Sequence, residues 1–287
     1  MAKLKTVPIL VSDLSEYLSG QDDFRLEVSV FKSFKSRNLK VLHGGTYEDP
    51  VTKLPRQFDI RGSIRKNGGL VHLAIECKNL KESFPLLVST LPRTDEESFH
   101  EVVFSHKTTY RDLIGSNSDT IRLTTPNSIY EKQKPCGKST TQVGRDSNGE
   151  LVTGDGEVYG KWSQAVSSAY DLVSDSNTDF EKNEHGIAFS IIIPVLVIND
   201  EVLWEANYNE NGELAEDPKQ VASSEVYLGK DLYTGPMGVW YTFSHLHIYT
   251  LSSFEVFLEK LNSDADYWAD LFPVENIQTL LEEKERE

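Results

Sequence analysis

The amino-acid sequence predicts an α/β protein with a mixed central β-sheet flanked by helices. Two β-rich segments are joined by Asn67-Gly68, and this dipeptide between such segments is a strong signal for a β-hairpin. Residues 188–198 form a continuous apolar and β-branched run, which is typical of a central strand buried on both faces. Apolar residues recur at helical spacing in 22–37 and 161–174. Strands and helices therefore alternate along the chain.

The composition is that of a folded globular protein. Of the 287 residues, 38% are hydrophobic and 26% are charged, which excludes disorder as the main state. The net charge of -16 excludes a protein that coats DNA through overall positive charge, although it leaves local binding to a few phosphates open. Two cysteines, Cys77 and Cys136, are too few for a disulfide framework or a zinc knuckle. The longest apolar run, 187–198, contains Pro194 and is too short for a membrane span, so we expect a cytoplasmic protein without a membrane partner.

The first part of the chain contains a helix–hairpin sequence. A short helix at 9–19 ends at Gly20, and His43-Gly44-Gly45 indicates a turn that is followed by a loop over 47–55. Beyond the helix at 22–37, the expected strands are 57–64, 70–78 and 83–90.

The rest of the chain adds an insertion and the second half of the core. Residues 91–160 are polar and irregular, and because a structureless loop of that length is uncommon, we expect extra strands or a flexible insertion there. The later elements are strands at 201–208 and 239–250, a helix at 254–261 and an exposed acidic helix at 280–287. We expect one domain over 1–287, with core segments 22–90 and 161–262, an insertion at about 91–160 and an acidic helical C-terminus at 263–287.

Charge is unevenly distributed along the chain. Residues 1–82 hold 14 lysines and arginines against 10 acidic residues, whereas the remainder holds 15 against 35. This basic segment is either a solvated surface or a surface that faces phosphate groups. On the second interpretation, Arg56, Arg61 and Lys66 are the expected DNA contacts.

The hairpin brings two carboxylates together. If Asn67 and Gly68 are the loop residues, Asp59 lies opposite Glu76, and Gln57 lies opposite Lys78. Val71, Leu73, Ile75 and Cys77 then form the core face, and His72, Ala74, Glu76 and Lys78 share the other face. Carboxylates about 5 Å apart repel each other unless a cation lies between them.

A divalent metal ion with oxygen ligands, Mg²⁺ or Mn²⁺, would be a suitable cation between the two carboxylates. Lys78 would hold a water molecule or stabilise the charge that develops on a phosphate. The alternative is a solvent-facing cross-strand pair in which Lys78 only neutralises Glu76.

These residues resemble the motif of the PD-(D/E)XK nuclease superfamily. Asp59, the tripeptide Glu76-Cys77-Lys78 and an upstream helical Glu27 occur in the order and spacing of that family, over roughly residues 22–80. The resemblance implies a restriction-endonuclease-like core with Asp59, Glu76 and Lys78 as catalytic residues. It also implies Glu27 as a further metal ligand and Gln164 as a supporting residue. The chain departs from the family in lacking a proline before Asp59 and in the long insertion after the hairpin.

The expected function is metal-dependent hydrolysis of DNA, with Gln57 and His72 supporting the site. A catalytically silent binding module on the same fold and an RNA-directed nuclease are the alternatives. The segment Gly137-Lys138-Ser139 lacks the glycine that a phosphate-binding loop needs at 132, so we expect no bound nucleotide cofactor. The missing nucleotide loop, the acidic charge after residue 82 and the long polar segment 91–160 favour an ATP-driven helicase or translocase as partner, in DNA repair or anti-phage defence. The alternative is a protein that acts alone and whose acidity serves solubility.

Overall fold

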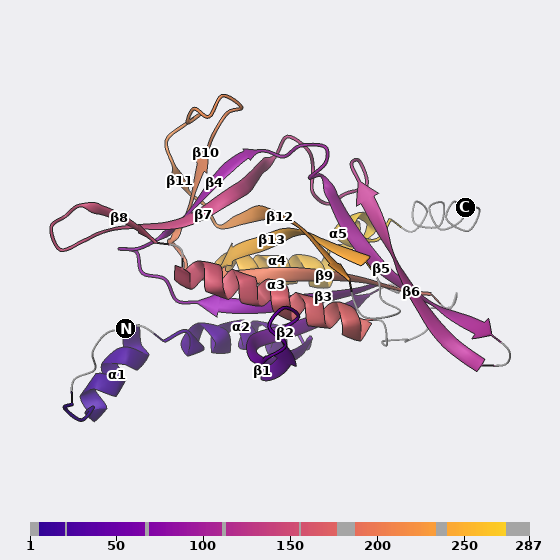
Figure 1. Cartoon of the computed structure of the whole chain (residues 1–287), viewed down its shortest axis with the longest axis horizontal. Helices are drawn as coiled ribbons and strands as arrows, with labels where there is room; N and C mark the ends of the chain where they lie inside the picture. The colour runs from indigo at the N-terminus through magenta and orange to yellow at the C-terminus, as the bar shows by residue number, and fades with distance from the viewer. Residues whose placement is uncertain are drawn as a thin grey trace.

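The computed structural model describes residues 6–20, 22–66, 69–110, 113–154, 156–176, 187–233 and 240–273. Within these ranges, thirteen strands form one sheet with helices packed on it, which confirms the α/β class (Figure 1). None of the helices in the described ranges is long and apolar enough to span a membrane.

The elements follow in chain order. The helices are α1 (Val11–Gly20), α2 (Phe24–Ser36), α3 (Gly156–Ser176), α4 (Leu251–Ser263) and α5 (Ala265–Leu271). The first strands are β1 (Lys40–Glu48), β2 (Pro55–Lys66), β3 (Gly69–Lys78), β4 (Leu86–Pro92), β5 (Phe99–Tyr110), β6 (Leu113–Thr124) and β7 (Pro135–Arg145). They are followed by β8 (Leu151–Gly154), β9 (Ile187–Ile198), β10 (Leu203–Asn207), β11 (Lys219–Gln220), β12 (Ser223–Tyr233) and β13 (Trp240–Thr250).

Strand β9 is the centre of the sheet. It pairs in parallel with β3 on one side and β13 on the other, and β5 joins it in antiparallel orientation. The order along the sheet is β1-β2-β3-β9-β13-β12-β7-β4-β10-β11. The β-branched run therefore forms the buried central strand that the sequence predicts, within a mixed sheet.

The β2–β3 hairpin has the predicted register. Its pairs run from Lys66 opposite Gly69 to Ile60 opposite Ile75. The loop residues Asn67 and Gly68 themselves lie outside the described residues. This register brings Asp59 and Glu76 to the same end of the hairpin.

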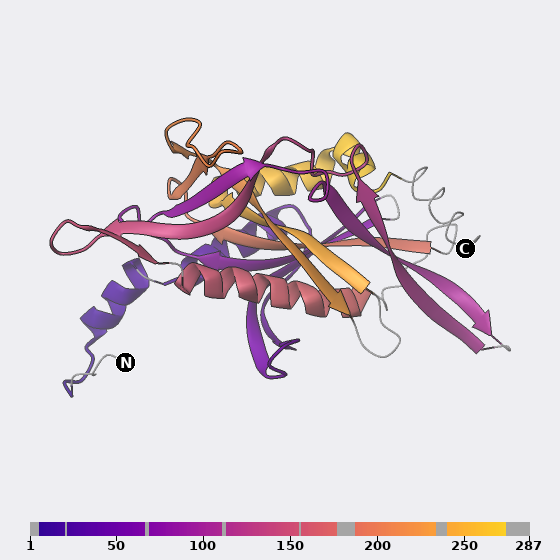
Figure 2. The ribbon, with the colours of Figure 1, turned by 45° about the horizontal axis from the view of Figure 1, so that its top comes forward.

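Both faces of β3 are buried, not one as the sequence analysis expected. Val71, Leu73, Ile75 and Cys77 pack with α2 and α4, as predicted for the core face. Ala74, on the other face, packs with Val166 and Ala169 of α3. Helix α3 thus covers the face that carries the carboxylates (Figure 2).

Other expectations need correction as well. Residues 43–45 lie inside β1 instead of in a turn, and a side chain at Gly45 would come within 2.5 Å of the Phe58 ring. The segment 91–160 contains β5 to β8, so it holds extra strands, and α3 begins at Gly156. Strand β12 was not expected, and the helix predicted at 280–287 lies outside the described residues.

Candidate active site

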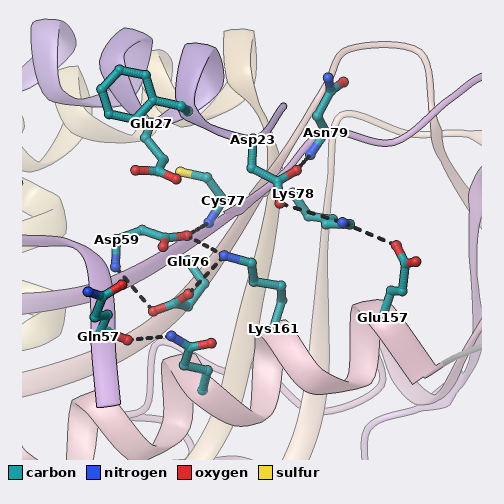
Figure 3. A network of polar contacts seen from close by, with 12 residues as sticks. Asp23, Glu27, Gln57, Asp59, Glu76, Cys77, Lys78, Asn79, Glu157 and Lys161 are labelled. Atoms are coloured by element: carbon teal, nitrogen blue, oxygen red, sulfur yellow. Dashed lines mark hydrogen bonds and ion pairs between the residues drawn. The ribbon is translucent and has the colours of Figure 1, made fainter. Parts of the chain in front are cut away.

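Asp59 of β2 and Glu76 of β3 contact each other at the end of the hairpin. The Asp59 amide donates to Glu76 Oε1 at 3.3 Å, and the Cys77 amide donates to Asp59 Oδ2 at 2.8 Å. The Glu76 side chain is fully buried, and that of Asp59 is 12% exposed. Both carboxylates therefore accept backbone hydrogen bonds from the neighbouring strand just beyond the last paired residues, Ile60 and Ile75 (Figure 3).

Lys161 of α3 contacts both carboxylates. Its Nζ lies 2.8 Å from Asp59 Oδ2 and 3.4 Å from Glu76 Oε2. Burial disfavours the ammonium form, but the charges of Asp59 and Glu76 outweigh it and raise the pKa of Lys161. Burial, reinforced by the Asp59 charge, raises the pKa of Glu76 well above its usual range. Two acids thus share one base, and burial beside Asp59 favours the protonated form of Glu76.

Lys78 turns toward α2 and α3. Its Nζ lies 3.1 Å from Glu157 Oε2 and 3.5 Å from Asp23 Oδ2. Asp23 is fixed in turn, because its Oδ1 accepts the Asn79 amide at 2.7 Å. The ammonium that the sequence analysis expected beside the carboxylates thus comes from Lys161.

One face of α3 is lined with polar residues that meet the hairpin. Glu157, Lys161 and Gln164 are spaced by four and three residues, which places them on one helix face. Gln164 Nε2 donates to the Gln57 carbonyl, so these two expected supporting residues do contact each other. The spacing of Glu157, Lys161 and Gln164 is the signal in the sequence that could have identified Lys161.

Arg61 lies further along the same interface. It is 9% exposed, its Nη1 contacts Asp171 Oδ2 at 2.8 Å, and its Nε donates to Ser168 Oγ at 3.1 Å. Its guanidinium also stacks 4.3 Å from the Phe58 ring centre. The expectation that Arg61 faces DNA is therefore wrong, because its charge holds α3 on β2.

The other two expected DNA contacts lie at opposite ends of β2. Arg56 is exposed near the carboxylates, and Lys66 is half-buried at the hairpin loop. Arg56 also lines a hollow of about 540 Å³ together with Lys78 and Lys161. The rest of its wall includes Tyr47, Asp49, Glu157 and Gln164. Three cationic side chains and two acids, Asp49 and Glu157, thus line this hollow.

Glu27 and His72 have their own partners. Glu27 Oε2 lies 3.0 Å from His43 Nε2, and burial together with the Asp59 charge raises the Glu27 pKa. The Glu27 carboxylate lies on the α2 side of Cys77 (Figure 3). His72 is buried, with Nδ1 3.1 Å from Ser63 Oγ.

The carboxylate pair fits Mg²⁺ better than a metal that needs a complete protein cage. Mg²⁺ is held by one or two carboxylates and takes its other ligands from water and substrate phosphate. Across the described residues, no group of three or more His, Cys, Asp or Glu side chains could hold a metal ion. Asp59 and Glu76, whose carboxylates accept backbone amides, are the residues that would hold such an ion.

Known proteins give no further guide to this site. No family model, no curated protein and no solved structure matches the chain.

Proposed function

We propose that the protein is a metal-dependent phosphodiesterase that hydrolyses DNA. The observation that carries this proposal is the buried Asp59–Glu76 pair, which shares one base and adjoins a hollow lined by three cationic side chains. Asp59 and Glu76 would hold Mg²⁺ or Mn²⁺. The metal, when bound, lowers the pKa of a water molecule and polarises the phosphate oxygen.

The residues around the pair have separate roles in this proposal. Arg56 and Lys78 line the hollow, where their charges would neutralise the substrate phosphate. Gln57 and Gln164 hold the first turns of α3 against β2, which fixes the distance between the hollow and the carboxylates.

The test is a cleavage assay on supercoiled plasmid, linear DNA and RNA, each with Mg²⁺, Mn²⁺ or EDTA. Asp59→Asn and Glu76→Gln are compared with Glu259→Gln, which removes an exposed acid paired with Arg37 outside the site. We expect metal-dependent DNA cleavage that only the first two variants lose. Cleavage restricted to RNA would change the substrate class, and no cleavage of any substrate would overturn the proposal.

A catalytically silent binding module is the second candidate. The observation in its favour is Lys161, whose ammonium contacts both acids. A silent module would bind DNA or a protein partner equally well with and without EDTA. Calorimetry would then show no Mn²⁺ binding by the wild-type protein.

We further propose that an ATP-driven partner delivers DNA to the site, as in repair or anti-phage systems. Residues after 82 carry 15 basic against 35 acidic side chains, a charge that opposes unassisted DNA binding. Helix α1 buries none of its residues, and Leu14 and Leu18 on it are more than half exposed. A monomer that degrades linear DNA at full rate in physiological salt would contradict the need for a partner.

A further inference from the structure

Two lysines lie near the carboxylate pair, and they differ in what they contact. Lys161 Nζ is within 3.4 Å of both Asp59 and Glu76, whereas Lys78 Nζ is within 3.5 Å of Asp23 and Glu157. Lys78 belongs to the tripeptide that the sequence analysis identified, and Lys161 lies on α3. The lysine that contacts the Asp59–Glu76 pair is therefore Lys161, which lies outside the tripeptide.

The first two turns of α3 make crossed ion pairs with the end of β3. Glu157 contacts Lys78, and one helical turn later Lys161 contacts Glu76. Glu157 is 78% exposed, so its pair with Lys78 is screened by water and is easily exchanged. The Lys161 pair is different, because Glu76 is fully buried and needs a positive neighbour whenever it is ionised.

The Lys161 ammonium contacts the two carboxylates that would hold a divalent cation. It contacts Oδ2 of Asp59 and Oε2 of Glu76, one oxygen from each acid of the proposed metal site. It also lines the hollow beside Arg56 and Lys78. A single side chain thus reaches both the carboxylates and the expected position of the phosphate.

We propose that Lys161 is an exchangeable counter-ion and the substrate-facing lysine of this site. Before metal binds, its ammonium contacts both acids and balances one carboxylate charge of the pair. A divalent cation competes for the same oxygens and displaces the ammonium into the hollow, where it contacts the phosphate. This inference rests on the proposed phosphodiesterase function, and it assigns to Lys161 the role that the sequence gave to Lys78.

The test measures Mn²⁺ binding by calorimetry, without substrate, for the wild type, Lys161→Met and Lys161→Arg, with Lys78→Met as the matched control. Because the competing charge is removed, Lys161→Met should bind Mn²⁺ about tenfold more tightly or better, and Lys78→Met should bind it as the wild type does. Lys161→Arg retains the charge and should show no tightening. At saturating Mn²⁺, Lys161→Met should cleave DNA about 100-fold more slowly.

The outcomes separate this inference from the function on which it rests. If Lys161→Met binds Mn²⁺ no more tightly while the wild type binds Mn²⁺ and cleaves DNA, the inference fails and the proposed function stands. Tighter binding with a wild-type cleavage rate overturns the substrate-facing role. If neither protein binds Mn²⁺, both proposals fail. Lys161→Gln serves as the second variant if the methionine variant does not fold, as judged by circular dichroism.

Discussion

The Asp59–Glu76 site and the buried cluster around Arg93 use charge in different ways. Arg93 is only 2% exposed, and its Nη2 lies 2.5 Å from Glu225 Oε2. Its Nη1 donates to the Glu131 carbonyl at 2.8 Å, and its Nε donates to His245 Nε2 at 3.1 Å. One base meets one acid there, so the cluster is balanced without a further ion.

The histidines near Arg93 are neutral at physiological pH. Burial lowers the pKa of His245, with a further contribution from the Arg93 charge, and burial also lowers the pKa of His247. His247 Nε2 lies 2.6 Å from the Tyr130 hydroxyl. Both regions adjoin a hollow, since Glu225 and His247 line one of about 900 Å³, so what distinguishes the candidate catalytic site is that two acids share one base there.

The largest effect is expected from neutralising the acid pair. Asp59→Asn and Glu76→Gln should each reduce the cleavage rate about 1000-fold or more, because each removes a metal ligand. Removing one of two repelling charges should leave the melting temperature unchanged or raised. Asp59→Ala is a less suitable variant, because loss of the acceptor for the Cys77 amide should cost about 1–2 kcal/mol of unfolding free energy.

The opposite pattern is expected in the balanced cluster. Arg93→Met should lower the free energy of unfolding by about 2–3 kcal/mol, a value reduced from that of a fully buried pair because Glu225 is 37% exposed. Cleavage per folded molecule should not change. Urea unfolding and the cleavage assay on the same samples check both statements, and a selective loss of activity would remove the distinction between the two regions.

His100, whose ring centre lies 6.5 Å from that of Tyr130 beside the Arg93 cluster, makes stability pH-dependent. Burial lowers the pKa of His100 to about 4, against a hydrogen bond to the Leu271 carbonyl that favours the charged form. The unfolded chain takes up this proton near pH 6.5 and the folded chain does not, so stability falls as pH decreases from 6.5 toward 4. His100→Gln should reduce this slope by about 1.4 kcal/mol per pH unit, as measured by urea unfolding between pH 6.5 and 5. An unchanged slope would mean that His100 is accessible to protons in the folded protein.

The smallest effect is expected at the surface. Arg56→Gln should weaken DNA binding severalfold and reduce the slope of log affinity against log salt by about 1, because one phosphate contact is lost. Lys66→Gln, at the other end of β2, should have less effect. Fluorescence anisotropy with labelled duplex DNA at several salt concentrations measures both. Equal losses would mean that DNA follows the whole length of β2.

The sequence was informative where the signals are local. The Asn67-Gly68 dipeptide specified a hairpin register that the structure confirms from Ile60 to Lys66, and that register placed Asp59 beside Glu76. The apolar run at 188–198 identified β9 in the same way. In both cases a few adjacent residues determine the local geometry.

The sequence was less informative where distant segments meet. Lys161 reaches the pair from a helix that begins beyond the whole insertion, and Asp171 reaches Arg61 from the same helix. The spacing of Glu157, Lys161 and Gln164 marks a polar face of α3, but what that face and Asp171 contact depends on how α3 is placed across the sheet. Strand β1 was missed for a different reason. Gly44-Gly45 is typical of a turn, but Gly45 lies within the strand, where it packs closely against the Phe58 ring.

Mn²⁺ binding to matched acid variants tests the central claim most directly. Glu76→Gln removes an acid from the pair that shares one base, and Glu225→Gln removes an acid from the balanced cluster. Calorimetry should show that the wild type and Glu225→Gln bind Mn²⁺ at one site and that Glu76→Gln does not. Binding that survives in Glu76→Gln, or that is absent from the wild type, would contradict a metal site at the Asp59–Glu76 pair.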